Sequence, residues 1–161
     1  MPENQQAVYL ITPKMSGFAN DLLVETEDKR ILYHVKAKLF APMGQIYTIV
    51  DEQKQEVYTT KEDNTIVFPC HTVFQKESLV ARVGQLGFLP QNYFLEIEKG
   101  RKLAIKIPVF GSIFRLEGQQ GIVAEIAQHR STWIVAINRD SNYTLILALL
   151  AIVYREYSIG G

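Results

Sequence analysis

The chain has 161 residues, of which 47% are hydrophobic, and its 17 lysine and arginine residues balance 17 aspartate and glutamate residues. This length fits one domain with a sizeable core, and we predict a single domain over residues 1–161. The formal net charge of zero argues against a nucleic-acid binder, which needs a strong positive field. A single cysteine, Cys70, excludes an internal disulfide and suits a reducing compartment.

The N-terminal part begins with a polar stretch. Residues 1–6 are predicted to form a disordered tail, and they lack the basic start and apolar core of a signal peptide, so we expect a cytoplasmic protein. Residues 7–11 predict a short strand that is ended by Pro13. Residues 15–25 fit either a short helix or an irregular strand.

A period of two residues predicts strands from residue 31 onward. Tyr33 and Val35 alternate with His34 and Lys36, which is typical of a half-buried strand. Polar turns, prolines and glycines separate the further strands that we predict at residues 45–50, 56–60, 65–68, 72–75 and 79–83. The second half repeats this pattern at residues 93–97, 102–107, 112–117, 122–127 and 133–137. Ten to twelve short strands at regular spacing are the signature of a barrel or a sandwich.

The most apolar run of the chain lies near its end, at residues 142–154. Spanning a bilayer takes roughly 20 apolar residues, and Arg155 and Glu156 follow this run directly, so a membrane span is not predicted. Its leucine and alanine content favours a helix, which we predict over residues 141–155. The apolar side chains lie on every side of that helix, so it must be buried on all sides. A sheet wrapped around it is the partner that the rest of the chain offers.

Several short segments occur in an order that resembles a known family. They are Leu39-Phe40 after a tyrosine-bearing strand, Asp51 at an Ile-Val strand end, Ala81-Arg82, residues 93–97, residues 121–126, a tryptophan-bearing strand, and Asp140 before the apolar run. Over roughly residues 31–156 this order is similar to that of the LURP-one-related proteins, which share a tubby C-terminal-like fold with the phospholipid scramblases. The resemblance implies an all-β fold: a closed antiparallel β-barrel of about 12 strands around a central hydrophobic C-terminal α-helix.

A cluster of four basic residues is the best candidate for an anion site. It consists of Lys99, Arg101, Lys102 and Lys106. Residues two apart on a strand share a face, so Lys102 and Lys106 are predicted to point together, while Arg101 points elsewhere or lies in the turn. The family resemblance implies contact of such a cluster with phosphoinositide or other anionic lipid head groups, as in a scramblase-like module. The competing interpretation is a solvated strand edge that lysines keep soluble, and we favour it for these four residues.

The residue types of enzymatic sites occur without the spacing that catalysis needs. His34, His71 and His129 lie far apart and match no zinc motif, so we interpret them as structural or surface residues. Cys70 is interpreted as a small buried residue. The chain contains no nucleophile elbow and no phosphate-binding glycine loop. We therefore predict a non-enzymatic protein with no cofactor and no metal.

Two phenylalanines in predicted loops bear on the choice of partner. Phe88 and Phe110 fit either membrane-dipping loop tips or hydrophobic anchors that close the ends of the barrel. We predict a monomeric binding module for an anionic lipid head group or a membrane surface, which would make the protein membrane-peripheral. The alternative is a protein-interaction scaffold without lipid. A coherent basic patch favours lipid and an apolar patch favours a protein partner.

Overall fold

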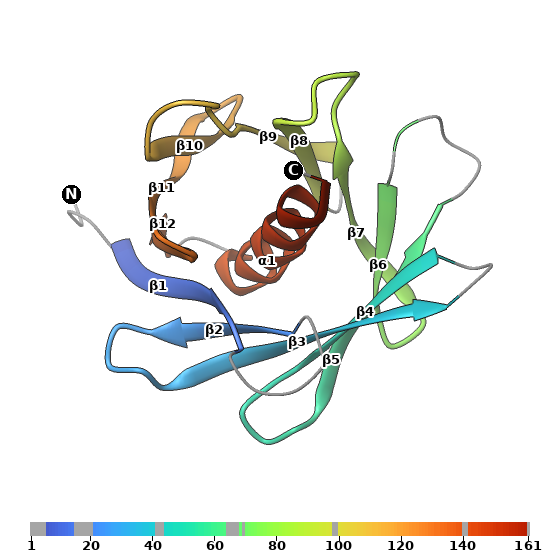
Figure 1. The fold of residues 1–161 in the computed structure, drawn as a ribbon. Coiled ribbons are helices and arrows are strands. Elements are labelled where there is room, and N and C mark those ends of the chain that lie inside the picture. Colours follow the sequence, from blue (N-terminus) through green and yellow to red (C-terminus); the bar gives the residue numbers. More distant parts are fainter. Residues whose placement is uncertain are drawn as a thin grey trace.

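The computed structural model describes residues 6–14, 21–40, 44–63, 68, 70–97, 100–139 and 142–160. Within these residues the chain forms twelve β-strands and one α-helix, α1, which covers Tyr143–Gly160 (Figure 1). The strands are β1 Gln6–Pro13, β2 Leu22–Thr26, β3 Ile31–Phe40, β4 Gly44–Val50, β5 Glu56–Glu62, β6 Cys70–Gln75, β7 Ser78–Gln85, β8 Asn92–Ile97, β9 Arg101–Lys106, β10 Ile113–Gly118, β11 Gly121–His129 and β12 Thr132–Asn138.

The strands close into one barrel. Each pairs antiparallel with its neighbours in sequence, and β1 pairs with β12 from Gln6 opposite Asn138 to Ile11 opposite Trp133. Closure removes the free sheet edges that an open sheet would expose. Figure 1 shows the strands as a ring with α1 inside it. The predicted all-β closed antiparallel barrel of about 12 strands around a C-terminal helix is therefore confirmed.

The barrel has two ends that differ in their connections. Because successive strands run in opposite directions, the connections after β1, β3, β5, β7, β9 and β11 all lie at one end. The C-terminal part of α1 lies at this end, where the Tyr154 hydroxyl donates to the carbonyl of Ser131 between β11 and β12. We call it the exit end. The connections after the even-numbered strands and the start of α1 form the opposite end.

Burial of α1 is complete over its central turns. Every residue from Ile146 to Val153 has 0% of its surface exposed. The inward side chains of the alternating strands surround it, and Trp133 packs edge to face against both Phe114, at 5.1 Å between ring centroids, and Tyr154, at 5.0 Å. Burying one large apolar side chain contributes roughly 1.5 to 3 kcal/mol. This helix is therefore the centre of the hydrophobic core.

The ends of the helix differ from the predicted residues 141–155. Asn142 has a φ of 71°, which is incompatible with a helix, so α1 begins at Tyr143, two residues later than predicted. At the other end the helix continues past Arg155 to Gly160. Charge alone does not end a helix, and the side chain of Glu156 has hydrogen-bonding partners inside the barrel wall.

Three other sequence predictions differ from the structure or lie outside the part that it describes. Gln6, predicted to belong to the disordered tail, is the first residue of β1, while residues 1–5 are outside the described part. The ambiguous stretch of residues 15–25 contains the start of β2 at Leu22, and residues 15–20 are not described. Of the strand predicted at residues 65–68, only Phe68 is described, and it belongs to no strand.

We predict that replacing Leu147 or Leu150 with Asp unfolds the protein. Both side chains are 0% exposed and are surrounded by apolar groups, so a carboxylate there would be buried without a partner. The matched control is Leu79→Asp, because Leu79 is 54% exposed. Circular dichroism and thermal melting check the result, and a folded Leu147→Asp protein with a melting temperature near that of the control would contradict the central position of α1.

Candidate functional site

A buried polar cluster holds the last turns of α1 against the barrel wall. Glu156 accepts a hydrogen bond from the Tyr47 hydroxyl of β4 at 3.1 Å, and its other carboxylate oxygen contacts Nε2 of His71 on β6. His71 is 0% exposed, and its ring lies 5.2 Å from that of Tyr47. A buried hydrogen bond to a charged group contributes about 1.5 to 3 kcal/mol. The cluster therefore links the helix to two strands.

Arg155 lies beside this cluster and is 8% exposed. Burial lowers the pKa of its guanidinium, while the nearby charges of Asp21 and Glu156 favour the protonated form. Its Nε has no hydrogen-bond partner among the described residues. Asp21 also contacts Nε2 of His34 at 3.1 Å. Arg155 is thus a buried cation balanced by carboxylates near the exit end.

Burial also raises the pKa of the tyrosines that face α1. The pKa of Tyr93 is raised to about 12, first by desolvation and then by the charge of Glu156. The same two causes, in the same order, raise the pKa of Tyr47 further. These hydroxyls therefore keep their protons above the pH at which an exposed tyrosine ionises, so that Tyr47 can donate to Glu156.

The other histidine and cysteine side chains show no sign of nucleophilic chemistry. Cys70 is buried, as predicted, and burial raises the pKa of its thiol, which disfavours the reactive thiolate. Its sulfur accepts a hydrogen bond from Arg82 at 3.7 Å. His129 is exposed at the end of β11. In the described part of the chain no three His, Cys, Asp or Glu side chains come together as a metal site would require.

The predicted basic cluster is divided between the two ends of the barrel. Lys102 and Lys106 are both exposed on the outer face of β9, and Arg101 is partly buried on the inward side, as the alternation predicted. However, Lys102 and Arg101 lie at the opposite end, whereas Lys106 lies at the exit end. Lys102 is also 3.8 Å from Glu96 on β8. Lys99 is outside the described residues.

Arg101 and Lys102 line a depression of about 750 Å³ at the opposite end of the barrel. The β10–β11 turn, from Gly118 to Gly121, forms much of its other side. Gly121 has a φ of 117°, a conformation that L side chains rarely adopt. Two cations and a glycine turn are suited to a small anion, but they cannot act together with Lys106.

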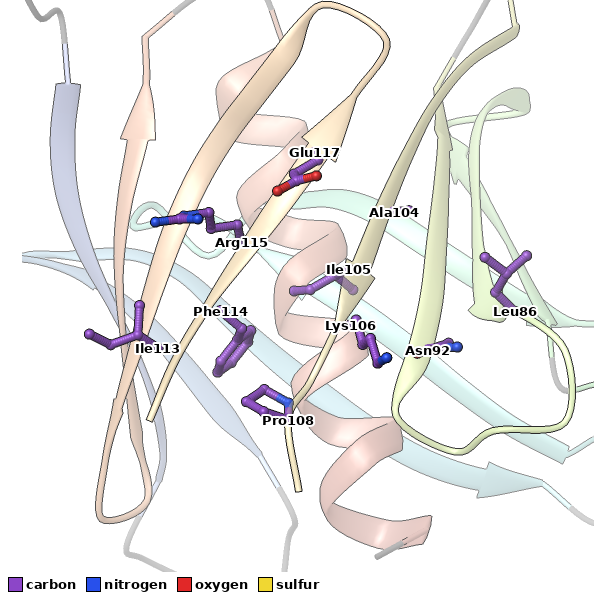
Figure 2. A pocket seen from close by; sticks show the side chains of 10 residues that line it. All are labelled: Leu86, Asn92, Ala104, Ile105, Lys106, Pro108, Ile113, Phe114, Arg115 and Glu117. Carbon is purple, nitrogen blue, oxygen red and sulfur yellow. The ribbon is translucent and has the colours of Figure 1, made fainter. Parts of the chain in front are cut away.

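A second depression of about 560 Å³ opens on the outer wall near the exit end (Figure 2). Lys106 of β9 and Arg115 of β10 lie on it, and Phe114 lies beneath. The Nε of Arg115 donates to Glu125 on β11 at 3.2 Å. We call this depression the β9–β10 groove.

The exit end carries the most exposed large apolar side chains that the structure describes. Phe88 in the β7–β8 loop is 86% exposed, and Phe110 in the β9–β10 loop is 91% exposed. Leu89 and Val109, their neighbours, are 54% and 66% exposed. The two loops are adjacent, since Ile107 donates its backbone N–H to the carbonyl of Gln91 at 2.9 Å. We call these four side chains the apolar loop tips.

The charges at the two ends of the barrel differ in exposure. At the exit end the exposed cations include Lys14, Lys38, Lys61, Lys106 and Arg130. The carboxylates of the same end are partly covered, namely Asp21, Glu62, Asp63 and Glu156. Exposed carboxylates of the opposite end include Glu27, Asp28, Glu52, Glu56 and Glu77. The opposite end also exposes cations, including Lys29, Arg30, Lys54, Lys76 and Lys102, so it presents both signs of charge, whereas the described carboxylates of the exit end are partly covered and its exposed charges are cations.

These observations define a class of protein, a closed antiparallel barrel around a central helix with candidate binding surfaces at its loops and outer wall. The chain belongs to the LURP-one-related family, whose family model matches residues 7–154. No curated protein matches it. The crystal structure of a protein from Arabidopsis thaliana is similar, with a TM-score of 0.65 and 15% sequence identity over 92% of this chain and 89% of that one. At this identity the similarity shows the fold alone.

The described residues contain no helix of the length and hydropathy that a bilayer crossing requires. The apolar run near the end of the sequence forms α1, which lies inside the barrel with its central residues fully buried.

We predict that Glu156→Ala lowers the free energy of unfolding by about 2 kcal/mol or more, because it leaves the buried ring of His71 and the Tyr47 hydroxyl without their partner. Urea unfolding measures the change. Glu52→Ala, in an exposed turn, is the control and should change stability by less than about 0.5 kcal/mol. Equal effects of the two variants would contradict a stabilising role of the cluster.

We predict that stability falls as the pH rises from 10 to about 12. Tyrosines of the unfolded chain ionise near pH 10, whereas Tyr93 retains its proton until about pH 12 in the fold. The unfolded state therefore binds fewer protons in this window and is favoured as the pH rises. Urea unfolding at several pH values checks the slope, and Tyr93→Phe should make it shallower. An unchanged slope would show that Tyr93 does not contribute.

Proposed function

We propose that this protein is a non-enzymatic binding module that attaches to the surface of an anionic membrane through its exit end. The observation that carries the proposal is the exposure of Phe88 and Phe110, at 86% and 91%, on two adjacent loops. A folded protein gains nothing by exposing two such side chains to water, whereas an interface that buries them would stabilise a complex.

The energetics of membrane contact support two cooperating signals. Full burial of a phenylalanine side chain contributes roughly 1.5 to 3 kcal/mol, and each nearby cation adds about 1 kcal/mol at an anionic surface. For lipid-modified proteins one acyl chain gives weak, reversible binding and a second signal gives stable attachment, and we expect an apolar signal combined with cations to act in the same way. The apolar loop tips supply the first signal, and exposed cations such as Lys106 and Arg130 supply the second.

This proposal changes which of the sequence-predicted residues take part. Lys106 lies at the exit end and contributes to membrane contact, while Arg101 and Lys102 lie at the opposite end, far along β9 from a membrane that is bound at the exit end. The partial coverage of Asp21 and Glu62 reduces the repulsion that carboxylates would cause. Glu62 accepts a hydrogen bond from the backbone of Gln45 at 2.7 Å, which holds its charge at the wall.

A second candidate function is a protein-interaction scaffold. The same apolar loop tips favour it, because an exposed apolar patch also fits a protein partner. Phe68 supports a defined shape for this patch, since its ring packs edge to face with that of Phe88 at 4.8 Å. The two functions differ in whether anionic lipid alone suffices for binding.

The test is co-sedimentation with vesicles of phosphatidylcholine, with and without phosphatidylserine. We predict that the protein binds the anionic vesicles and that the double variant Phe88→Ser, Phe110→Ser binds at least roughly tenfold more weakly. Lys106→Glu should weaken binding by roughly tenfold, and this loss should shrink at high salt. The matched control Lys102→Glu reverses a charge on the same strand at the opposite end and should bind like the wild type.

Each alternative outcome has a distinct meaning. If the wild-type protein does not bind the anionic vesicles, the membrane proposal is wrong and the scaffold remains. If Lys102→Glu abolishes binding while the double phenylalanine variant keeps it, the depression at Arg101 binds the lipid instead.

A further inference from the structure

The barrel wall is incompletely paired between β9 and β10. Pairing extends only from Gly118 opposite Leu103 to Leu116 opposite Ile105. Both strands continue toward the exit end, β9 to Lys106 and β10 from Ile113. The β9–β10 groove lies at this unpaired part.

The sequence explains why the pairing stops. If the register continued, Arg115 would lie opposite Lys106, and two like charges directly opposite each other destabilise a strand pair. Two residues further, Ile113 would lie opposite Pro108, which has no backbone N–H to donate. The unpaired part is therefore a consequence of residues that cannot complete the ladder.

Neighbouring hydrogen bonds show which backbone groups point into the opening. Gln128 of β11 donates to the carbonyl of Ser112 at 2.7 Å, so Ser112 faces β11. Backbone groups alternate sides along an antiparallel strand, so those of Ile113 and Arg115 face the opening. On β9, Ile107 donates toward β8, to the carbonyl of Gln91, so the backbone of Lys106 faces the opening as well.

The side chains around the opening are apolar, cationic and polar, and the polar ones are the amide of Asn92 and the exposed carboxylate of Glu117, which lies toward the paired part of β10. Ile113 and Leu86 are 60% and 50% exposed, and the buried Phe114 lies beneath the groove (Figure 2). Lys106 and Arg115 are the cations on it. Because Arg115 already donates to Glu125, Lys106 is the cation that we expect to meet an acidic side chain.

We propose that the β9–β10 groove binds an extended peptide segment of a partner protein, which adds as a strand along β10. Unpaired strand backbone is a template for another strand, and its main-chain hydrogen bonds supply affinity. Alternate side chains of the added strand face the groove floor and the outer rim. The segment is therefore apolar at the positions over Phe114 and acidic at those near Lys106.

A strand fits this opening better than a lipid chain. An acyl chain would cover the backbone groups of Ile113 and Arg115 without bonding to them, and a buried polar group without a partner is unfavourable. The inference goes beyond the proposed membrane function, because it concerns the outer wall and a protein segment. It holds whether or not the apolar loop tips bind lipid.

The experiment uses the full chain and a fluorescein-labelled, capped peptide in which aspartate and valine alternate over six residues. Fluorescence anisotropy measures binding, and amide hydrogen exchange locates it. Ile113→Pro removes the backbone N–H that faces the opening, whereas Ile113→Thr keeps it and changes the side chain. We expect Ile113→Pro to bind about tenfold more weakly than Ile113→Thr, which corresponds to about one main-chain hydrogen bond. Lys106→Glu should weaken binding about five- to tenfold at low salt.

Binding should also protect the amide hydrogens of Ile113 and Arg115 from exchange. Thermal melting establishes that each variant is folded. Equal affinity of the proline and threonine variants, or protection elsewhere on the protein, would overturn strand addition. So would the absence of peptide binding to the wild type, or competition for the groove by anionic vesicles that protect the same amides.

Discussion

A helix that is apolar on every side must be enclosed, and this requirement governs the whole molecule. The residues from Ile146 to Val153 are completely buried, which one sheet packed on one side would not achieve. Twelve short strands supply a wall that meets the helix all the way round, and pairing of β1 with β12 closes it. The inward positions of the strands are consequently devoted to packing.

This use of the interior leaves recognition to the loops and the outer face. Phe88 and Phe110, the two most exposed phenylalanines in the part of the chain that the structure describes, lie on loops of the exit end, where cations are exposed and carboxylates are partly covered. The interior polar groups have a different role. Glu156 accepts a hydrogen bond from Tyr47 and contacts Nε2 of His71 where the helix leaves the apolar core, so the helix continues across a position that carries charge.

Much of the fold could be predicted from local pattern, because alternation along strands and the all-round apolar helix are properties of neighbouring residues. The polar cluster could not, since Tyr47 and Glu156 lie far apart in the chain and meet only through closure of the barrel. The division of the predicted basic cluster between the two ends of the barrel has the same cause. Lys102 and Lys106 share a face, as their spacing indicates, but only the topology shows that they belong to opposite ends. Phe88 and Phe110 could be placed in loops from the sequence, but the choice between exposed loop tips and buried anchors depended on the folded structure.

The pairing of β1 with β12 also constrains the order in which the elements of the barrel can fold. Gln6 belongs to the first strand and its partner Asn138 to the last, so this contact closes a loop of nearly the whole chain. Such closure costs entropy before it gains contacts, and non-local pairing of this kind slows folding. During synthesis the inward faces of the early strands have no helix to pack against until α1, which follows all twelve strands in the chain, has been made. Folding of this protein is therefore tied to completion of its C-terminal segment, and partly made chains expose the surfaces that associate with one another.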